Sequence, residues 1–198
     1  MNIIKHLHLV NKHRFFVFIH CIRLGLPFRG LKHDLSKYSP FELFNSAKYY
    51  RGSGTPIYVQ RRKEGVYSSL AVRHTHRNKH HYEYWIDIYL NNVVLIMMPY
   101  KYAIEYVADI ISASKVYNHK KYNRSLPYEY FASHSSYSPM HKGTRDFVLT
   151  ILSEYAKHGF KYLKKKHSKK IYQEIKNKYP KVEIHPIDLN DDIKIDLS

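Results

Sequence analysis

The stretch Leu31-Lys32-His33-Asp34-Leu35-Ser36-Lys37 indicates both the fold and the chemistry of this chain. Leu31 and Leu35 are four residues apart, a spacing that predicts a helix with one side facing a core. Imidazoles and carboxylates are ligands of divalent transition metals, so the doublet His33-Asp34 is a candidate pair of metal ligands. Neighbouring residues on a helix are separated by about 100°, so both reach one cation only at the edge of the core-facing stripe.

Further candidates flank the doublet. His13 falls in an apolar first helix, and Asp109 falls in an apolar helical segment, where a carboxylate must be paired, hydrogen-bonded or bound to metal. Metal binding accounts for the doublet as well. Glu105, one turn before Asp109, is either a residue that orients a ligand or a solvated carboxylate. Lys37 lies on the same side as Asp34, where it would hold a phosphate oxygen.

A histidine-rich cluster, His74-Thr75-His76-Arg77-Asn78-Lys79-His80-His81, lies between the doublet and Asp109. On a continuous helix His76 and His80 would share one face. These histidines supply further imidazoles that could accompany the doublet as metal ligands. The alternative is a strip of cations for phosphate, since Arg73, Arg77 and Lys79 are interleaved with the histidines. Both interpretations can hold together.

The apolar spacing is mostly helical, and the chain is predicted to be all-α. Ser39 and Pro40 form a helix start, and Gly159 marks a helix break. Helices are expected over residues 4–24, 28–37, 40–50, 67–76, 80–90, 100–116, 127–133 and 144–166, with 57–64 partly helical or disordered. Residues 1–167 are expected to form one helical domain. Residues 168–198, which follow a Lys-rich run, are expected to form an appendage that is in part disordered.

Composition narrows the range of partners and compartments. The net charge of +17, from 33 Lys and Arg against 16 Asp and Glu, favours nucleic acid, nucleotides or anionic membranes, although compositional drift explains it equally well. The single Cys21 excludes an intramolecular disulfide and is expected to be buried. Neither a transmembrane segment nor a signal peptide is expected. The expected location is the cytoplasm, or the host cytoplasm for a viral protein.

The order His13, His33-Asp34, Asp109 resembles the His…His-Asp…Asp pattern of the HD-domain superfamily of metal-dependent phosphohydrolases. Val107-Ala108-Asp109 is similar to the Ala-Asp helix of that superfamily. The resemblance implies an HD-type helical bundle in which these four residues hold a divalent transition metal such as Mn, Fe, Ni or Co. Members with two metals insert further histidines, which implies that His74, His80 and His81 hold a second ion.

The chain also resembles a set of uncharacterised phage and bacterial proteins. The shared features are His-Asp-Leu-Ser-Lys, the segment Arg77-Asn78-Lys79-His80-His81, and Met98-Pro99. The HD superfamily often has Gly where Ser36 stands here. The histidine cluster is also denser than a one-metal member requires, which leaves the number of metals open.

The resemblance implies hydrolysis of a phosphomonoester or phosphodiester, with a nucleotide or a nucleic-acid-derived substrate. Lys37, Arg77 and Lys79 would then neutralise phosphate charge. One alternative is a basic, non-catalytic nucleic-acid-binding protein, which the charge and the 20 Tyr and 9 Phe favour. Another is an HD fold that binds metal without hydrolase activity.

Overall fold

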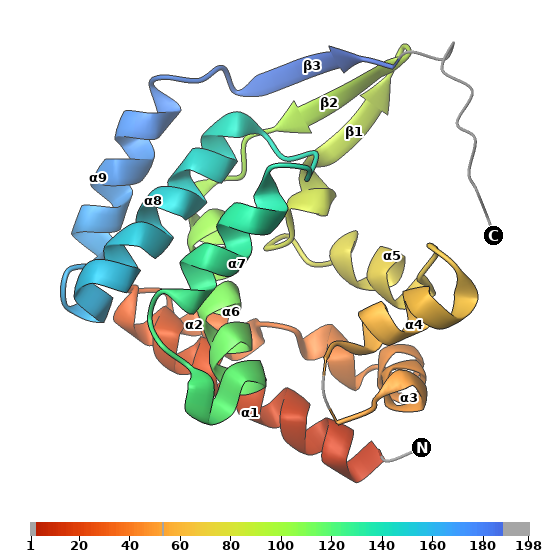
Figure 1. Ribbon diagram of the computed structural model, residues 1–198. Helices are drawn as coiled ribbons and strands as arrows, with labels where there is room; N and C mark the ends of the chain where they lie inside the picture. The colour runs from red at the N-terminus through yellow and green to blue at the C-terminus, as the bar shows by residue number, and fades with distance from the viewer. Residues whose placement is uncertain (1–2, 53, 188–198) are drawn as a thin grey trace.

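The computed structural model describes residues 3–52 and 54–187, and it is largely helical, as predicted. Figure 1 shows the helices stacked beside one another, with a small sheet at one end. The first half contains α1 (Ile3–Arg23), α2 (Pro27–Lys32), the 3₁₀ helix η1 (Leu35–Tyr38), α3 (Pro40–Tyr49), α4 (Pro56–Glu64) and α5 (Ser69–Thr75). The second half contains α6 (Tyr100–Asn118), η3 (His119–Lys121), α7 (Leu126–Ser135), α8 (Lys142–His158), η4 (Gly159–Lys161) and α9 (Lys165–Lys176).

Helix α6 is the centre of the core. It packs against α1, α7 and α8, and its apolar side chains are excluded from solvent on most of its faces. Cys21 is fully buried in this core, as predicted. The interior is built mainly from Val17, Leu24, Ile104, Val107, Ile111, Phe147, Ile151 and Leu152. A helix buried on so many sides holds its polar side chains in fixed positions.

The predicted helix over residues 28–37 is interrupted at the doublet. His33 is extended, with φ −55° and ψ 131°, and Asp34 has a left-handed backbone, with φ 50° and ψ 30°. Asp is one of the few residues that adopt this conformation at low cost. The guanidinium of Arg14 donates to the carbonyls of His33 (2.7 Å) and Leu31 (2.9 Å), which fastens the break to α1.

This break changes the role of the leucines around it. Leu31 and Leu35 are 58% and 53% exposed, so the predicted core-facing stripe is wrong. The predicted start of α3 is confirmed, because the hydroxyl of Ser39 accepts from the backbone N–H of Glu42 and Pro40 opens the helix.

A three-stranded antiparallel sheet is the main departure from the all-α prediction. The predicted helix over 80–90 is wrong, because η2 (Tyr82–Trp85) leads into β1 (Ile86–Tyr89), which pairs with β2 (Asn92–Ile96). Leu90 and Asn91 both have positive φ, 44° and 55°, as a two-residue hairpin turn requires. β-branched residues in β1 and β2 fit the pleated strands better than a helix.

The C-terminal segment packs on the rest of the molecule as far as it is described. Strand β3 (Val182–Pro186) pairs with β2, and α9 packs on α8. The hydroxyl of Tyr172 donates to the carbonyl of Met98 (2.8 Å), and the hydroxyls of Tyr100 and Ser168 are hydrogen-bonded (2.8 Å). The predicted boundary at residue 168 falls inside α9. Residues 168–187 thus form part of one packed unit, and residues 188–198 lie outside the described part.

In the described part of the chain, no helix combines the length and the apolar character needed to cross a membrane.

Replacing Gly30 tests the contact that positions the doublet. A Cβ at Gly30 would lie 2.7 Å from the Cβ of Cys21 and 2.9 Å from the Cα of Phe18, so α2 would have to move away from α1. Gly-to-Ala changes inside a helix usually stabilise it by about 1 kcal/mol. Here we expect Gly30→Ala to lower the free energy of unfolding by about 1–3 kcal/mol in urea titrations. The exposed neighbour change Leu31→Ala should stay within about 0.5 kcal/mol of the parent chain.

The pH dependence of stability tests the burial of His20. Its Nδ1 donates to the hydroxyl of Ser112 (2.8 Å), and burial, with help from nearby Lys115 and Arg23, lowers the pKa of His20 to about 3. In the unfolded chain the pKa is about 6.5, so below that pH the unfolded state binds more protons. Stability should therefore fall as the pH drops from about 6.5 towards 3.

The matched pair for this experiment is His20→Gln and His8→Gln, the latter at an exposed position of the same helix. In chelator-treated protein, His20→Gln should reduce the slope of unfolding free energy against pH by up to about 1.4 kcal/mol per pH unit. His8→Gln should leave the slope unchanged. Equal slopes for the parent chain and His20→Gln would contradict a neutral, buried His20.

Candidate metal centre

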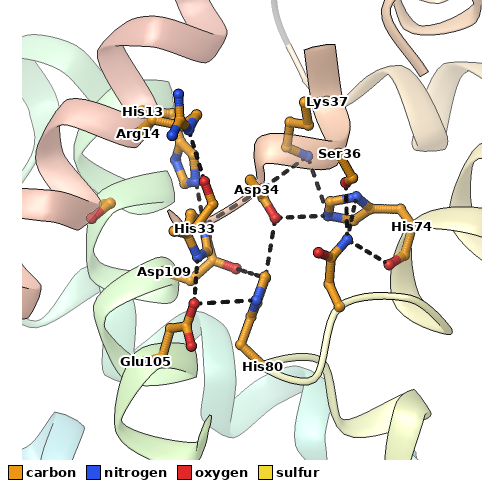
Figure 2. A network of polar contacts seen from close by, with 12 residues as sticks. His13, Arg14, His33, Asp34, Ser36, Lys37, His74, His80, Glu105 and Asp109 are labelled. Atoms are coloured by element: carbon orange, nitrogen blue, oxygen red, sulfur yellow. Dashed lines mark hydrogen bonds and ion pairs between the residues drawn. The ribbon is translucent and has the colours of Figure 1, made fainter. Parts of the chain in front are cut away.

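Eight side chains with metal-binding atoms lie close together, although they come from distant parts of the chain. Helix α1, the α2–η1 break, α5, the loop after α5 and α6 all contribute. The residues are His13, His33, Asp34, His74, His80, His81, Glu105 and Asp109, and Figure 2 shows all of them except His81. Every metal-ligand candidate from the sequence is therefore brought to this cluster.

The first group consists of His13, His33 and Asp109. The Oδ1 atom of Asp109 is 3.0 Å from Nε2 of His13 and 3.8 Å from Nε2 of His33. Asp109 projects from the buried central helix, whereas His13 comes from α1, which packs beside it. The packing of these two helices therefore sets the spacing of this group.

The second group consists of Asp34, His74, His80 and His81. Oδ1 of Asp34 is 3.4 Å from Nε2 of His74 and 3.3 Å from Nε2 of His80. The other oxygen of Asp34, Oδ2, is 3.5 Å from Nε2 of His33 in the first group. Asp34 thus spans the two groups, and its left-handed backbone lets it do so while His33 faces the same point.

Two buried carboxylates lie close to the Nδ1 atoms of three of the histidines. Oε1 of Glu105 is 3.1 Å from Nδ1 of His33 and 3.5 Å from Nδ1 of His80. Oε2 of Glu42 is 3.0 Å from Nδ1 of His74. Nδ1 of His33 and Nδ1 of His74 are hydrogen-bonded to these carboxylates, and an N–H donated from Nδ1 leaves the lone pair of each of these two rings on Nε2.

Glu105 is therefore not the solvated carboxylate of the alternative interpretation. It is 1% exposed, and the guanidinium of Arg29 lies 2.5 Å from its Oε2. Glu42 is a further residue of the site that the sequence does not reveal. Its only local signal is its place in the first turn of α3, and its partner His74 is 32 residues away in the chain.

Unpaired buried atoms make the cluster compatible with a bound cation. Nε2 of His33, His80 and His81 and Oδ1 of Asp34 are buried without a hydrogen-bond partner. Lone pairs facing one another at such distances repel unless a cation lies between them. Bonds of about 2.1 Å to one ion would bring its ligand atoms roughly 3–3.5 Å apart. Imidazoles and carboxylates together suit a divalent transition metal.

The charges of the cluster keep its carboxylates ionised. Burial by itself would raise the pKa of Asp34, but His33, Lys37 and His74 hold that pKa well below its ordinary value. Burial likewise opposes ionisation of Asp109, and His13 and His33 lower its pKa. Burial, followed by the neighbouring His80, holds the pKa of His81 well below 6.5, so this ring is neutral and able to bind metal.

Five residues of the cluster, His13, Asp34, His74, His81 and Asp109, line a cavity of about 780 Å³. Lys37 also lines this cavity, and its Nζ is 3.2 Å from Oδ2 of Asp34, which agrees with the predicted placement on the same side. Arg77 and Lys79 are exposed and do not line it, so the structure does not bring these two predicted phosphate contacts to the cluster. His76 is exposed after the end of α5, so its predicted shared face with His80 is wrong.

The model of a family of unknown function, DUF5662, matches residues 2–154. The chain belongs to this family. The DUF5662 match includes every residue of the cluster and ends within α8, leaving α9 and β3 outside. The description of this family does not mention the HD-domain superfamily. No curated protein and no solved structure matches the DUF5662 chain.

Neutralising the supporting carboxylates Glu42 and Glu105 should weaken metal binding by this chain. Glu105→Gln and Glu42→Gln each remove a charge that fixes a histidine, so we expect affinity for Mn²⁺ to fall about 10- to 100-fold in calorimetric titrations. Asp34→Asn should cost more, because Asp34 spans both groups. His76→Ala, an exposed change in the same histidine-rich stretch, should bind like the parent chain. Unaltered affinity in both Glu variants would refute this role.

Proposed function

We propose that this chain is a metal-dependent phosphohydrolase of the HD type, acting on a phosphomonoester or phosphodiester such as a nucleotide or a nucleic-acid-derived substrate. The observation that supports it is the convergence of five imidazoles and three carboxylates, five of which line a cavity together with Lys37. One or two ions of Mn, Fe, Ni or Co suit this ligand set. A single buried cysteine accords with a cytoplasmic location.

A divalent ion, when bound, supplies Lewis acidity to a phosphoryl oxygen and to water. His13, His33 and Asp109 would hold one ion, and Asp34, His74, His80 and His81 a second. Lys37 is placed to neutralise phosphate charge. Its ammonium lies 3.2 Å from Asp34, and that carboxylate opposes the effect of burial and raises the pKa of Lys37. The lysine therefore remains cationic at neutral pH and donates hydrogen bonds to a phosphate oxygen.

Glu42 and Glu105 contribute by position rather than by contact with substrate. They hold His74 and His33 with the lone pair on Nε2, as described above, so the ligand set needs little rearrangement on binding.

Hydrolysis of p-nitrophenyl phosphate and bis(p-nitrophenyl) phosphate with Mn²⁺ tests the proposal. We expect turnover of at least one ester, abolished by chelator and by Asp34→Asn. Lys37→Ala should lower kcat/KM about 100-fold or more, because it removes the cation placed for the phosphate. Since Lys37 also contacts Asp34 and His74, rates are compared at saturating Mn²⁺ with metal content measured in each sample. Lys63→Ala, an exposed change on α4, is the matched control.

Other outcomes separate the competing functions. Bound metal without turnover of any phosphate ester would favour a metal-binding fold that lacks hydrolase activity. Metal-independent binding of DNA or RNA that weakens steeply with salt, again without turnover, would favour a basic nucleic-acid-binding protein.

A further inference from the structure

The cavity wall is nearly free of cations, in contrast to the chain as a whole. The sequence has 33 Lys and Arg, yet among the described residues of the wall Lys37 is the one Lys or Arg. Four carboxylates line the same cavity: Asp34, Glu42, Asp109 and Glu129. Among the described residues, the Lys and Arg side chains other than Lys37 therefore lie outside the lining of the space that a substrate would occupy.

This distribution limits how much negative charge the cavity can accept. Lys37 is already paired with Asp34, and any cations that the cluster binds lie beside the residues that hold them. A second or third phosphoryl group that reaches past the cluster meets no further Lys or Arg among the described wall residues, and Glu129, which lines the same cavity, repels it.

The first residues of α4 also line the cavity, but their backbone N–H groups do not compensate for the lack of Lys and Arg in the wall. Pro56 has no N–H, and the N–H of Tyr58 is bonded to the hydroxyl of Thr55 (3.2 Å). That helix end therefore offers a phosphate less than an open N-terminus would.

The remaining wall suits an uncharged group with a ring. Tyr106, Tyr117 and Tyr130 line it together with aliphatic residues such as Ile57, Leu70 and Ile110. His6 joins them, and burial, followed by the charge of Lys37, lowers the pKa of His6 to about 4, so its imidazole is neutral. Aromatic and aliphatic walls with a few neutral polar groups typically bind flat, uncharged organic groups.

We propose that the cavity takes a phosphate monoester with a single phosphoryl group and an uncharged, ring-bearing organic part, and that it excludes di- and triphosphates. This inference rests on the proposed function in treating the bound ester as a substrate. The charge pattern of the cavity wall supports the preference for one phosphoryl group independently. The phosphoryl group lies against the metal cluster and Lys37, and the organic part lies against the tyrosines.

A matched series tests the charge limit. With Mn²⁺ in excess, kcat/KM for a nucleoside monophosphate should exceed that for its di- and triphosphate by about 100-fold or more. Glycerol 3-phosphate, which has no ring, should be a poorer substrate than the nucleoside monophosphate. Glu129→Lys should improve use of the triphosphate relative to the monophosphate about tenfold. Glu174→Lys makes the same charge change at an exposed position on α9, away from the cavity, and should not.

Binding provides a second readout that does not depend on turnover. Calorimetry with non-hydrolysable phosphonate analogues of the mono- and triphosphate should show preference for the analogue with one phosphoryl group. If p-nitrophenyl phosphate is hydrolysed but the mono- and triphosphates are used or bound equally well, this inference is overturned and the proposed function stands. If no ester is hydrolysed but the one-phosphoryl analogue binds preferentially, the inference stands and the proposed hydrolase does not.

Discussion

The buried charge of Asp34 is the constraint on which the rest of the site depends. Its side chain is 2% exposed, and an isolated carboxylate in such a place would cost several kcal/mol. Lys37 and three imidazoles surround it, and one of its oxygens still has no hydrogen-bond partner. Residues from α5 and from the loop after it are brought to this point because the carboxylate needs positive or polar partners on every side.

The α2–η1 break makes this arrangement compatible with a helical fold. On a continuous helix, His33 and Asp34 would diverge by about 100°. The left-handed backbone at Asp34 turns both side chains to one point, and Arg14 binds the carbonyls that the interruption leaves free. Arg14 and His13 are neighbours on α1, so this helix both secures the break and supplies a side chain to the cluster.

The parts that could be predicted from the sequence depend on local signals. Ser39 and Pro40 mark a helix start within a few residues, and the apolar spacing around Asp109 reveals a buried helix. The break could not be predicted, because Leu31 and Leu35 have helical spacing and the left-handed turn depends on Arg14, which is 17 residues or more away. The role of Glu42 depends on a contact with His74, which only the tertiary fold creates. Leu90-Asn91 is a weaker hairpin signal than Asn-Gly, and it follows a stretch whose histidines have helical spacing.

The hydrogen bonds of Tyr172 and Ser168 connect the C-terminal segment to the alignment of the metal cluster. These residues fasten the beginning of α6, yet they follow the segment that the family model matches. A helix fixed at its first turn carries that placement along its axis to Glu105 and Asp109. The C-terminal segment therefore helps to align side chains that it does not supply, so the chemistry of the site and its alignment are encoded in separate stretches of the chain.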